Sequence, residues 1–209
     1  MTEASQQVLE VLRSPENLQW HVVPLIALVM YIYNSELEKK RHGEVYLGIY
    51  FLAISGVFLE IVNALVLHWS GRAALWTTPG NSAFVIYAGW NVEILFLAAV
   101  GGLTVLKGLP EKDQRILGFP NRRILPLCWA VGAVFIEVLL NKGGLLVWEY
   151  NHWRWPNLYF MVIWWAVPYY ILLWLHDNLS LEAKGRLAAV SVVFAVGCHV
   201  LFAVLLEWV

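Results

Sequence analysis

Charged residues are scarce in this chain: lysine, arginine, aspartate and glutamate make up 14% of its 209 residues, whereas about a quarter is typical of soluble domains. The formal net charge is only −1, so no basic surface points to a nucleic acid as partner. The two cysteines, Cys128 and Cys198, lie far apart and form neither a metal-type spacing nor a disulfide framework. This composition excludes a soluble globular protein, a disordered protein and a nucleic-acid-binding protein.

Long apolar runs account for the missing charge, since 60% of the residues are hydrophobic. A membrane-spanning helix needs about 20 mostly apolar residues, because no backbone polar group can stay unpaired in hydrocarbon. We therefore expect an all-α, polytopic membrane helical bundle that forms a single domain over residues 1–209, with a short interfacial helix at residues 1–13. The six expected spans cover about residues 18–35, 45–69, 83–106, 124–141, 157–176 and 186–208.

Lysine and arginine predict the orientation, because cytoplasmic loops of membrane proteins carry an excess of both. Ten of the 14 lie in or next to three loops, 36–44, 107–123 and 177–185, and the other four are Arg13, Arg72, Lys142 and Arg154. These loops are expected to be cytoplasmic and both termini outside, in a multi-pass protein of the cell membrane. An aromatic belt is expected at the outer surface, formed by Trp20, Trp69, Trp76, Trp148, Trp153, Trp155 and Trp208.

Polar side chains inside the expected spans gather in their outer halves. Glu60 comes eight residues before His68, which places it roughly 12 Å below the outer edge. The inner halves contain almost no such groups, so the pattern predicts a polar chamber that opens outward above an apolar plug. Ionisable residues within a membrane are functional candidates by default. The acids of the chamber are Glu60, Glu93 and Glu137, and its amides are Asn63, Asn91 and Asn141.

Two outer loops, 70–82 and 142–156, are apolar enough to form a lid over this chamber. Trp148 and Glu149 in the second loop, together with Trp90, His21 and His68, complete the candidate substrate-binding residues. Simpler interpretations stay open: the acids can hydrogen-bond their neighbouring asparagines as interhelical contacts, and the loops and histidines can be interfacial anchors.

The first functional hypothesis is a membrane enzyme that carries out acid–base chemistry on an isoprenoid or other lipid. Carboxyl groups in different surroundings can divide into an acid and a base, and aromatic faces stabilise developing positive charge. This chemistry isomerises or cyclises a lipid without a cofactor. Glu93, Glu60 and Glu137 are the candidate catalytic residues.

One segment, Gly89-Trp90-Asn91-Val92-Glu93, resembles the integral-membrane terpene cyclases of meroterpenoid pathways. In that family an Asn-Trp-Glu grouping supplies the acid, so the resemblance implies this role for Glu93. The likeness covers one span, and here the tryptophan precedes the asparagine. No second-acid motif is found, so Glu60 or Glu137 as the second acid follows from depth alone.

Two other classes of function are open. A metal-dependent enzyme could bind iron, manganese or zinc through the acids with His21 and His68, but the Glu-x-x-His pairs typical of carboxylate-bridged di-metal sites are missing from the spans. A proton- or cation-coupled transporter, or a lipid-binding protein, would also use intramembrane acids. A retinal protein is excluded, because no lysine lies inside a span to form the Schiff base.

Overall fold

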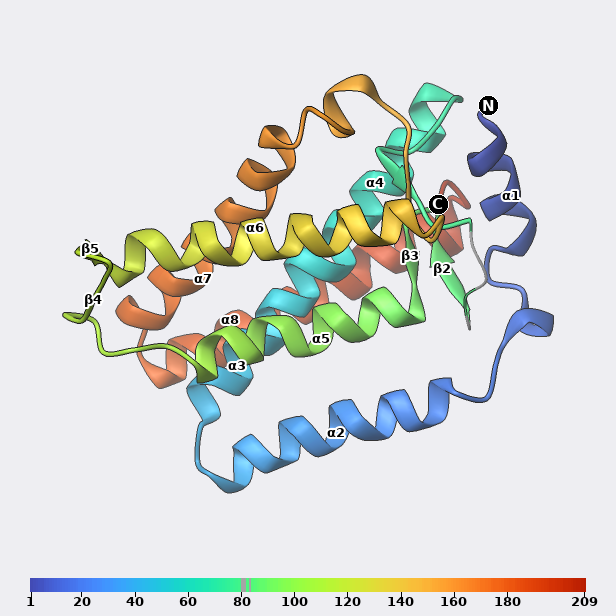
Figure 1. The fold of residues 1–209 in the computed structure, drawn as a ribbon. Helices are drawn as coiled ribbons and strands as arrows, with labels where there is room; N and C mark the ends of the chain where they lie inside the picture. Colours follow the sequence, from blue (N-terminus) through green and yellow to red (C-terminus); the bar gives the residue numbers. More distant parts are fainter. Residues whose placement is uncertain (80–81, 83) are drawn as a thin grey trace.

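The computed structural model describes residues 1–79, 82 and 84–209, which form a helical bundle with short strands at both of its ends (Figure 1). The α-helices are α1 (Glu3–Val11), α2 (Val22–Glu38), α3 (His42–Phe51), α4 (Leu59–Ser70), α5 (Val92–Lys107), α6 (Asn121–Lys142), α7 (Tyr159–Asn178) and α8 (Leu181–His199). Two 3₁₀ turns, η1 (Pro15–Asn17) and η3 (Asn151–Trp153), and two π-helical segments, η2 (Leu52–Phe58) and η4 (Val200–Leu205), interrupt or extend them. The strands are β1 (Trp76–Thr77), β2 (Val85–Tyr87), β3 (Trp90–Asn91), β4 (Arg115–Ile116), β5 (Phe119–Pro120) and β6 (Val147–Trp148).

Four continuous helices among the described residues are long and apolar enough to cross a membrane: His42–Ser70, Asn121–Lys142, Tyr159–Asn178 and Leu181–Leu205. They occupy the second, fourth, fifth and sixth expected spans, which confirms the prediction of a mostly helical membrane protein. The first and third expected spans also contain helices, but α2 and α5 are only 17 and 16 residues long.

The third expected span, 83–106, starts too early. Residue 83 lies outside the described residues, and β2 and β3 then pair as a short hairpin, so α5 begins only at Val92. The reason is local, because the Asn91 side chain accepts a hydrogen bond from the backbone N–H of Ile94 and caps the helix there. A similar cap at Ser180 starts α8 at Leu181, inside the expected loop 177–185.

The two ends of the bundle differ. Both termini, β1–β3 and β6 lie at one end, which we call the Trp-rich end (Figure 1). The α2–α3 turn, the β4–β5 hairpin and the α7–α8 turn lie at the opposite end, which we call the charged end. At the Trp-rich end the two loops expected to form a lid are joined, since β1 pairs antiparallel with β6 and sets Trp76 opposite Trp148.

The N-terminal helix packs on this joined pair of loops. Val8 of α1 is fully buried in an apolar cluster with Leu67, Ala74, Val85 and Ala88. At the N-cap of α1, the Thr2 hydroxyl donates a hydrogen bond of 2.7 Å to a carboxylate oxygen of Glu149. These contacts make α1 the outer cover of the Trp-rich end.

The seven tryptophans expected in one interfacial belt differ in exposure, and Trp208 is half-buried. Three are well exposed, as a belt requires: Trp20, Trp69 and Trp155. Three others are buried: Trp76, Trp148 and Trp153. The belt assignment is wrong for this second group, because β1–β6 pairing turns these rings inward, where Trp76 stacks on Trp153 at a centroid distance of 5.5 Å.

Candidate functional site

Glu60 and Asn63 lie one turn apart on α4 and are both buried. Asn63 anchors β1, since its amide donates to the Trp76 carbonyl at 2.9 Å and its oxygen accepts from the Leu75 N–H at 2.8 Å. One Glu60 oxygen, Oε1, accepts from the Trp76 indole N–H at 3.2 Å. The other, Oε2, is buried and has no hydrogen-bond partner among the described residues. Glu60 is thus held in place by one oxygen and presents the second to the interior.

Glu137 reaches the same region from α6. Its carboxylate accepts a hydrogen bond from the indole N–H of Trp165 on α7. Trp165 packs against the same apolar cluster that contains Trp76, the hydrogen-bond partner of Glu60. The Trp148 indole also lies near Glu137, although its N–H makes no hydrogen bond of normal geometry with any described residue. Two carboxyl groups from separate spans therefore converge.

Tryptophan rings surround the two acids. Trp164 meets Trp76 and Trp153 edge-on, at centroid distances of 6.1 Å and 5.3 Å. The indole N–H groups of Trp148 and Trp153 are buried and without a partner in the described part of the chain. Because a buried polar atom without a partner costs about 1–3 kcal/mol, each instance calls for an explanation. We define Glu60, Glu137, Trp76, Trp148 and Trp153 as the Glu60–Glu137 site.

The third predicted acid, Glu93, has a different environment. It lies in the first turn of α5, where a carboxylate is favoured by the helix dipole. One oxygen is 3.3 Å from Nε2 of His21, and the other accepts a hydrogen bond of 2.7 Å from the Ser82 hydroxyl. Both Glu93 and His21 are about two-fifths exposed. Glu93 and His21 thus form a half-exposed pair at the first turn of α5.

The other candidate substrate-binding residues have local partners. Trp90 stacks on Tyr87, and Asn91 is the cap of α5. Exposed His68 stacks on Trp208 at 4.9 Å. The side chain of Asn141 donates to the Leu146 carbonyl at 2.9 Å and fixes the turn after α6. Of the predicted set, the structure brings together Glu60, Glu137, Asn63 and Trp148.

In the described residues, no three histidine, cysteine, aspartate or glutamate side chains cluster as metal ligands. The Glu60–Glu137 site offers two carboxyl groups and indole N–H donors. Such a set can hold a proton and an oxygen-bearing group, and it can place aromatic faces against an apolar chain.

Several residues of the site were not among the sequence candidates. Trp76 and Trp153 were missed because tryptophans near a span end are typical of a belt, and only the β1–β6 pairing reveals their burial. Trp165 lies in the middle of the fifth expected span, and only the approach of Glu137 from α6 shows its role as a hydrogen-bond donor. Outside the site, His199 Nδ1 shares a hydrogen bond of 2.6 Å with the Tyr87 hydroxyl. A weak signal existed in the density of tryptophan in the loop at 148–155.

Helices of membrane-spanning length with buried acids among tryptophans define an integral membrane protein. The chain belongs to an uncharacterized membrane protein family, which matches residues 2–205. It is similar over its whole length to an uncharacterized protein of Archaeoglobus fulgidus, with 33% identity over 212 residues that cover 100% of this chain and 99% of the relative. No solved structure matches the chain.

Proposed function

We propose that this protein is an integral membrane enzyme that transfers protons to and from a lipid substrate at the Glu60–Glu137 site. The observation that carries the proposal is that three buried polar atoms of this site, of six such atoms in the described chain, make no hydrogen bond of normal geometry with a described residue: Glu60 Oε2, Trp148 Nε1 and Trp153 Nε1. A bound molecule with an oxygen-bearing group would satisfy these atoms. Its apolar part would lie against the indole rings.

The reaction class follows from two neighbouring carboxyl groups. A protonated carboxyl donates its proton to one carbon of a double bond, the π electron pair forms the new C–H bond, and positive charge develops on the other carbon. The second carboxylate then removes a proton from an adjacent carbon, whose C–H pair restores a double bond. The sum is an isomerisation, or a cyclisation when the cation is first attacked by another double bond of the same substrate. Tryptophan faces stabilise the intermediate charge.

The roles of the residues differ in this proposal. Glu60 and Glu137 are the acid–base pair, because two such groups in different surroundings can divide into donor and acceptor. Asn63 is a positioning residue that holds Trp76 against Glu60. The resemblance to membrane terpene cyclases implies Glu93 as the acid, whereas the geometry favours the Glu60–Glu137 pair. An isoprenoid or another unsaturated lipid fits this chemistry.

The membrane arrangement is part of the same proposal. We infer six spans in the cell membrane, with the short helices α2 and α5 inserted beside the four long ones. The charged end faces the cytoplasm, since ten of the 14 lysine and arginine residues lie there. The Glu60–Glu137 site is then nearer the outer surface.

Deuterium incorporation tests this function directly. Purified protein in nanodiscs is incubated with unsaturated lipid extract in D₂O, and lipids that gain one non-exchangeable deuterium are measured by mass spectrometry. The wild type is expected to form such a product. Glu60→Gln and Glu137→Gln are each expected to lower the rate at least about 100-fold, as for loss of a general acid or base.

Glu93→Gln is the matched control, since it removes an acid outside the pair and is expected to keep the product. Size-exclusion profiles confirm that each variant is folded. The proposal is overturned if wild type and heat-denatured protein give the same lipids, or if both pair variants match the wild type. Uptake driven by a pH gradient in proteoliposomes, without deuterated lipid, would instead show a transporter.

A further inference from the structure

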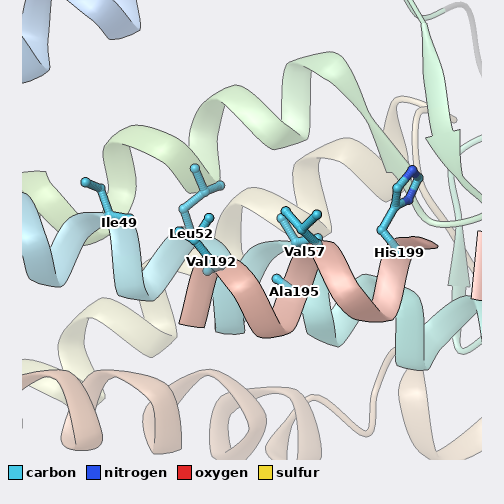
Figure 2. Close-up of a pocket in the computed structure, with 8 residues that line it drawn as sticks. Ile49, Leu52, Val57, Val192, Ala195 and His199 are labelled. Atoms are coloured by element: carbon cyan, nitrogen blue, oxygen red, sulfur yellow. The ribbon is translucent and has the colours of Figure 1, made fainter. Parts of the chain in front are cut away.

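An apolar groove runs along the α3–η2 and α8 helices and ends at a histidine (Figure 2). Its volume is about 250 Å³. One wall carries Ile49, Leu52 and Val57, and the other carries Val192, Ala195 and Val196. Figure 2 shows His199 at one end of this row, with its ring on the same side as the Leu52 and Val57 side chains.

The shape of the groove fits one extended chain. From Ile49 to Val57 the helix rises by roughly 12 Å, at 1.5 Å per residue. Val196 is 55% exposed, so the groove opens on the side of α8 that faces away from the bundle. This helix belongs to a span that is long enough to cross a membrane. The medium at such a surface is hydrocarbon. The groove is therefore continuous with the lipid phase, and an apolar chain can enter it sideways.

Helix irregularity shapes one wall. The π-helical segment η2 supplies Leu52 and Val57, whereas Val192, Ala195 and Val196 of the other wall lie in the regular helix α8. A π-helical turn is wider than an α-helical turn and shifts the side chains that follow it, and such turns are frequent at functional sites. A second π-helical segment, η4, begins directly after His199, at the polar end of the groove.

The polar end of the groove is a Tyr87–His199 pair. The Tyr87 hydroxyl lies 2.6 Å from Nδ1 of His199, and burial raises the pKa of Tyr87 to about 12. The hydroxyl therefore keeps its proton. Because Tyr87 is 1% exposed, its O–H donates a hydrogen bond to Nδ1 of His199 and not to water. A neutral His199 ring then carries its own hydrogen on Nε2, which makes Nε2 a donor at the end of an otherwise apolar groove.

We propose that this groove binds one unbranched apolar chain of the lipid substrate, with His199 Nε2 donating a hydrogen bond to a hydroxyl or carbonyl oxygen near the end of the chain. Val57 precedes Glu60 by three residues, about 4.5 Å along the helix axis, so a chain in the groove ends close to the acid pair. This inference rests on the proposed function only in its identification of the bound apolar chain as part of the substrate.

A photoreactive probe tests the groove. The probe is a 16-carbon primary alcohol that carries a diazirine near the middle of its chain, added to the full-length protein in phosphatidylcholine nanodiscs. Peptides that contain residues 49–57 and 192–199 are expected to be labelled, and excess unlabelled hexadecanol is expected to remove the label. Because one hydrogen bond distinguishes the two competitors, hexadecane should compete about three- to ten-fold less well than hexadecanol.

Two exposed valines of α8 provide matched variants. Val196→Trp fills the groove and is expected to reduce competed labelling at least ten-fold, whereas Val193→Trp, at a position 72% exposed and outside the groove, is expected to leave it unchanged. His199→Phe should abolish the advantage of hexadecanol over hexadecane. If His199→Phe does not fold, Tyr87→Phe takes its place in the test. Without the Tyr87 hydroxyl, nothing fixes the hydrogen of the His199 ring on Nε2, so the advantage of hexadecanol over hexadecane should be smaller.

The outcomes separate this inference from the proposed function. Labelling that persists in Glu60→Gln and Glu137→Gln supports the groove even where no deuterated lipid is formed. Labelling that hexadecanol does not remove, or that is equal in Val196→Trp and Val193→Trp, overturns the inference and leaves the acid–base proposal standing on its own test.

Discussion

Buried carboxylates occur at both ends of the bundle, and their partners differ completely. At the charged end Glu36 is fully buried and is surrounded by cations: Lys107 at 2.9 Å, Lys39 at 3.1 Å and Arg41 at 3.3 Å. At the Trp-rich end Glu60 has one indole donor and an oxygen without a partner among the described residues. No lysine or arginine is paired with it in the described ion pairs.

This contrast separates a structural acid, Glu36, from the acid that we propose to be functional, Glu60. The hydrogen bond from Lys107, at the end of α5, holds the pKa of Glu36 below its ordinary value, so the carboxylate ties α2 and the α2–α3 turn to α5. A buried charge that is fully paired is costly to disturb. Glu60, in contrast, has an oxygen and neighbouring indole N–H groups that make no hydrogen bond in the described residues. Such atoms contribute little to the stability of the fold and are available to a ligand.

The largest effect on stability is expected from the residue that builds the site. Asn63→Ala removes hydrogen bonds to the Leu75 N–H and the Trp76 carbonyl and leaves both groups buried, so we expect a loss of about 3 kcal/mol. Asn141→Ala removes a single bond to Leu146 and should cost about 1 kcal/mol. Denaturant titrations in detergent measure both, and equal losses would contradict the anchoring role of Asn63.

A smaller loss is expected from crowding the same place. A Cβ on Gly89 would lie 2.2 Å from Nδ2 of Asn63 and 2.6 Å from Nε1 of Trp76, so Gly89→Ala should cost about 1–3 kcal/mol. The control is Gly132→Ala on α6, where the new Cβ meets nothing within 4 Å and should stabilise by up to about 1 kcal/mol. Thermal melts of the two variants should shift in opposite directions, and a Gly89→Ala melt at the wild-type temperature would disprove the close packing.

The charged end should show its own pH dependence. Because the pKa of Glu36 is lower in the folded state than its ordinary value of 4.5, its contribution to stability is fully present above about pH 4.5. That contribution is lost as the pH falls further, through the folded-state pKa. The difference in Tm between wild type and Glu36→Gln should thus be constant from pH 7 to pH 5 and narrow below pH 4.5. A difference that widens on acidification would contradict this assignment.

The smallest effect is expected where an ion pair is exposed. Glu182 and Arg186 approach to 3.0 Å on the first turns of α8, and their side chains are 78% and 74% exposed. Glu182→Gln should therefore change the free energy of unfolding by less than about 0.5 kcal/mol. Thermal melts of the wild type and Glu182→Gln at low and high salt provide the check. A larger change in the free energy of unfolding would show that this ion pair stabilises the fold despite its exposure.

Sequence reasoning predicts the fold class well, because apolar length and charge are properties of each segment alone. It fails where contacts between distant segments decide. The burial of Trp76, Trp148 and Trp153 depends on the pairing of β1 with β6, in which Trp76 lies opposite Trp148, 72 residues later in the chain. Glu36 falls in an expected loop, and only the approach of Lys107 from α5 explains its burial.

The candidate site divides in the same way. Depth along a helix placed Glu60 and Glu137 toward one end, and the structure brings them together. Depth alone could not distinguish them from Glu93, because the direction of a side chain around the helix axis depends on where the helix starts. The Asn91 cap and β2–β3 pairing fix that start for α5, and Glu93 meets His21 as a result.

The thermal stability of two single variants at pH 7, Glu36→Gln and Glu60→Gln, tests the distinction between the ends most directly. Glu36→Gln removes the partner of three cations and is expected to melt well below the wild type. Glu60→Gln keeps an acceptor for the Trp76 indole and is expected to melt at the wild-type temperature or above it. An equal fall in Tm for both would contradict the account, since Glu60 would then be as much a part of the scaffold as Glu36.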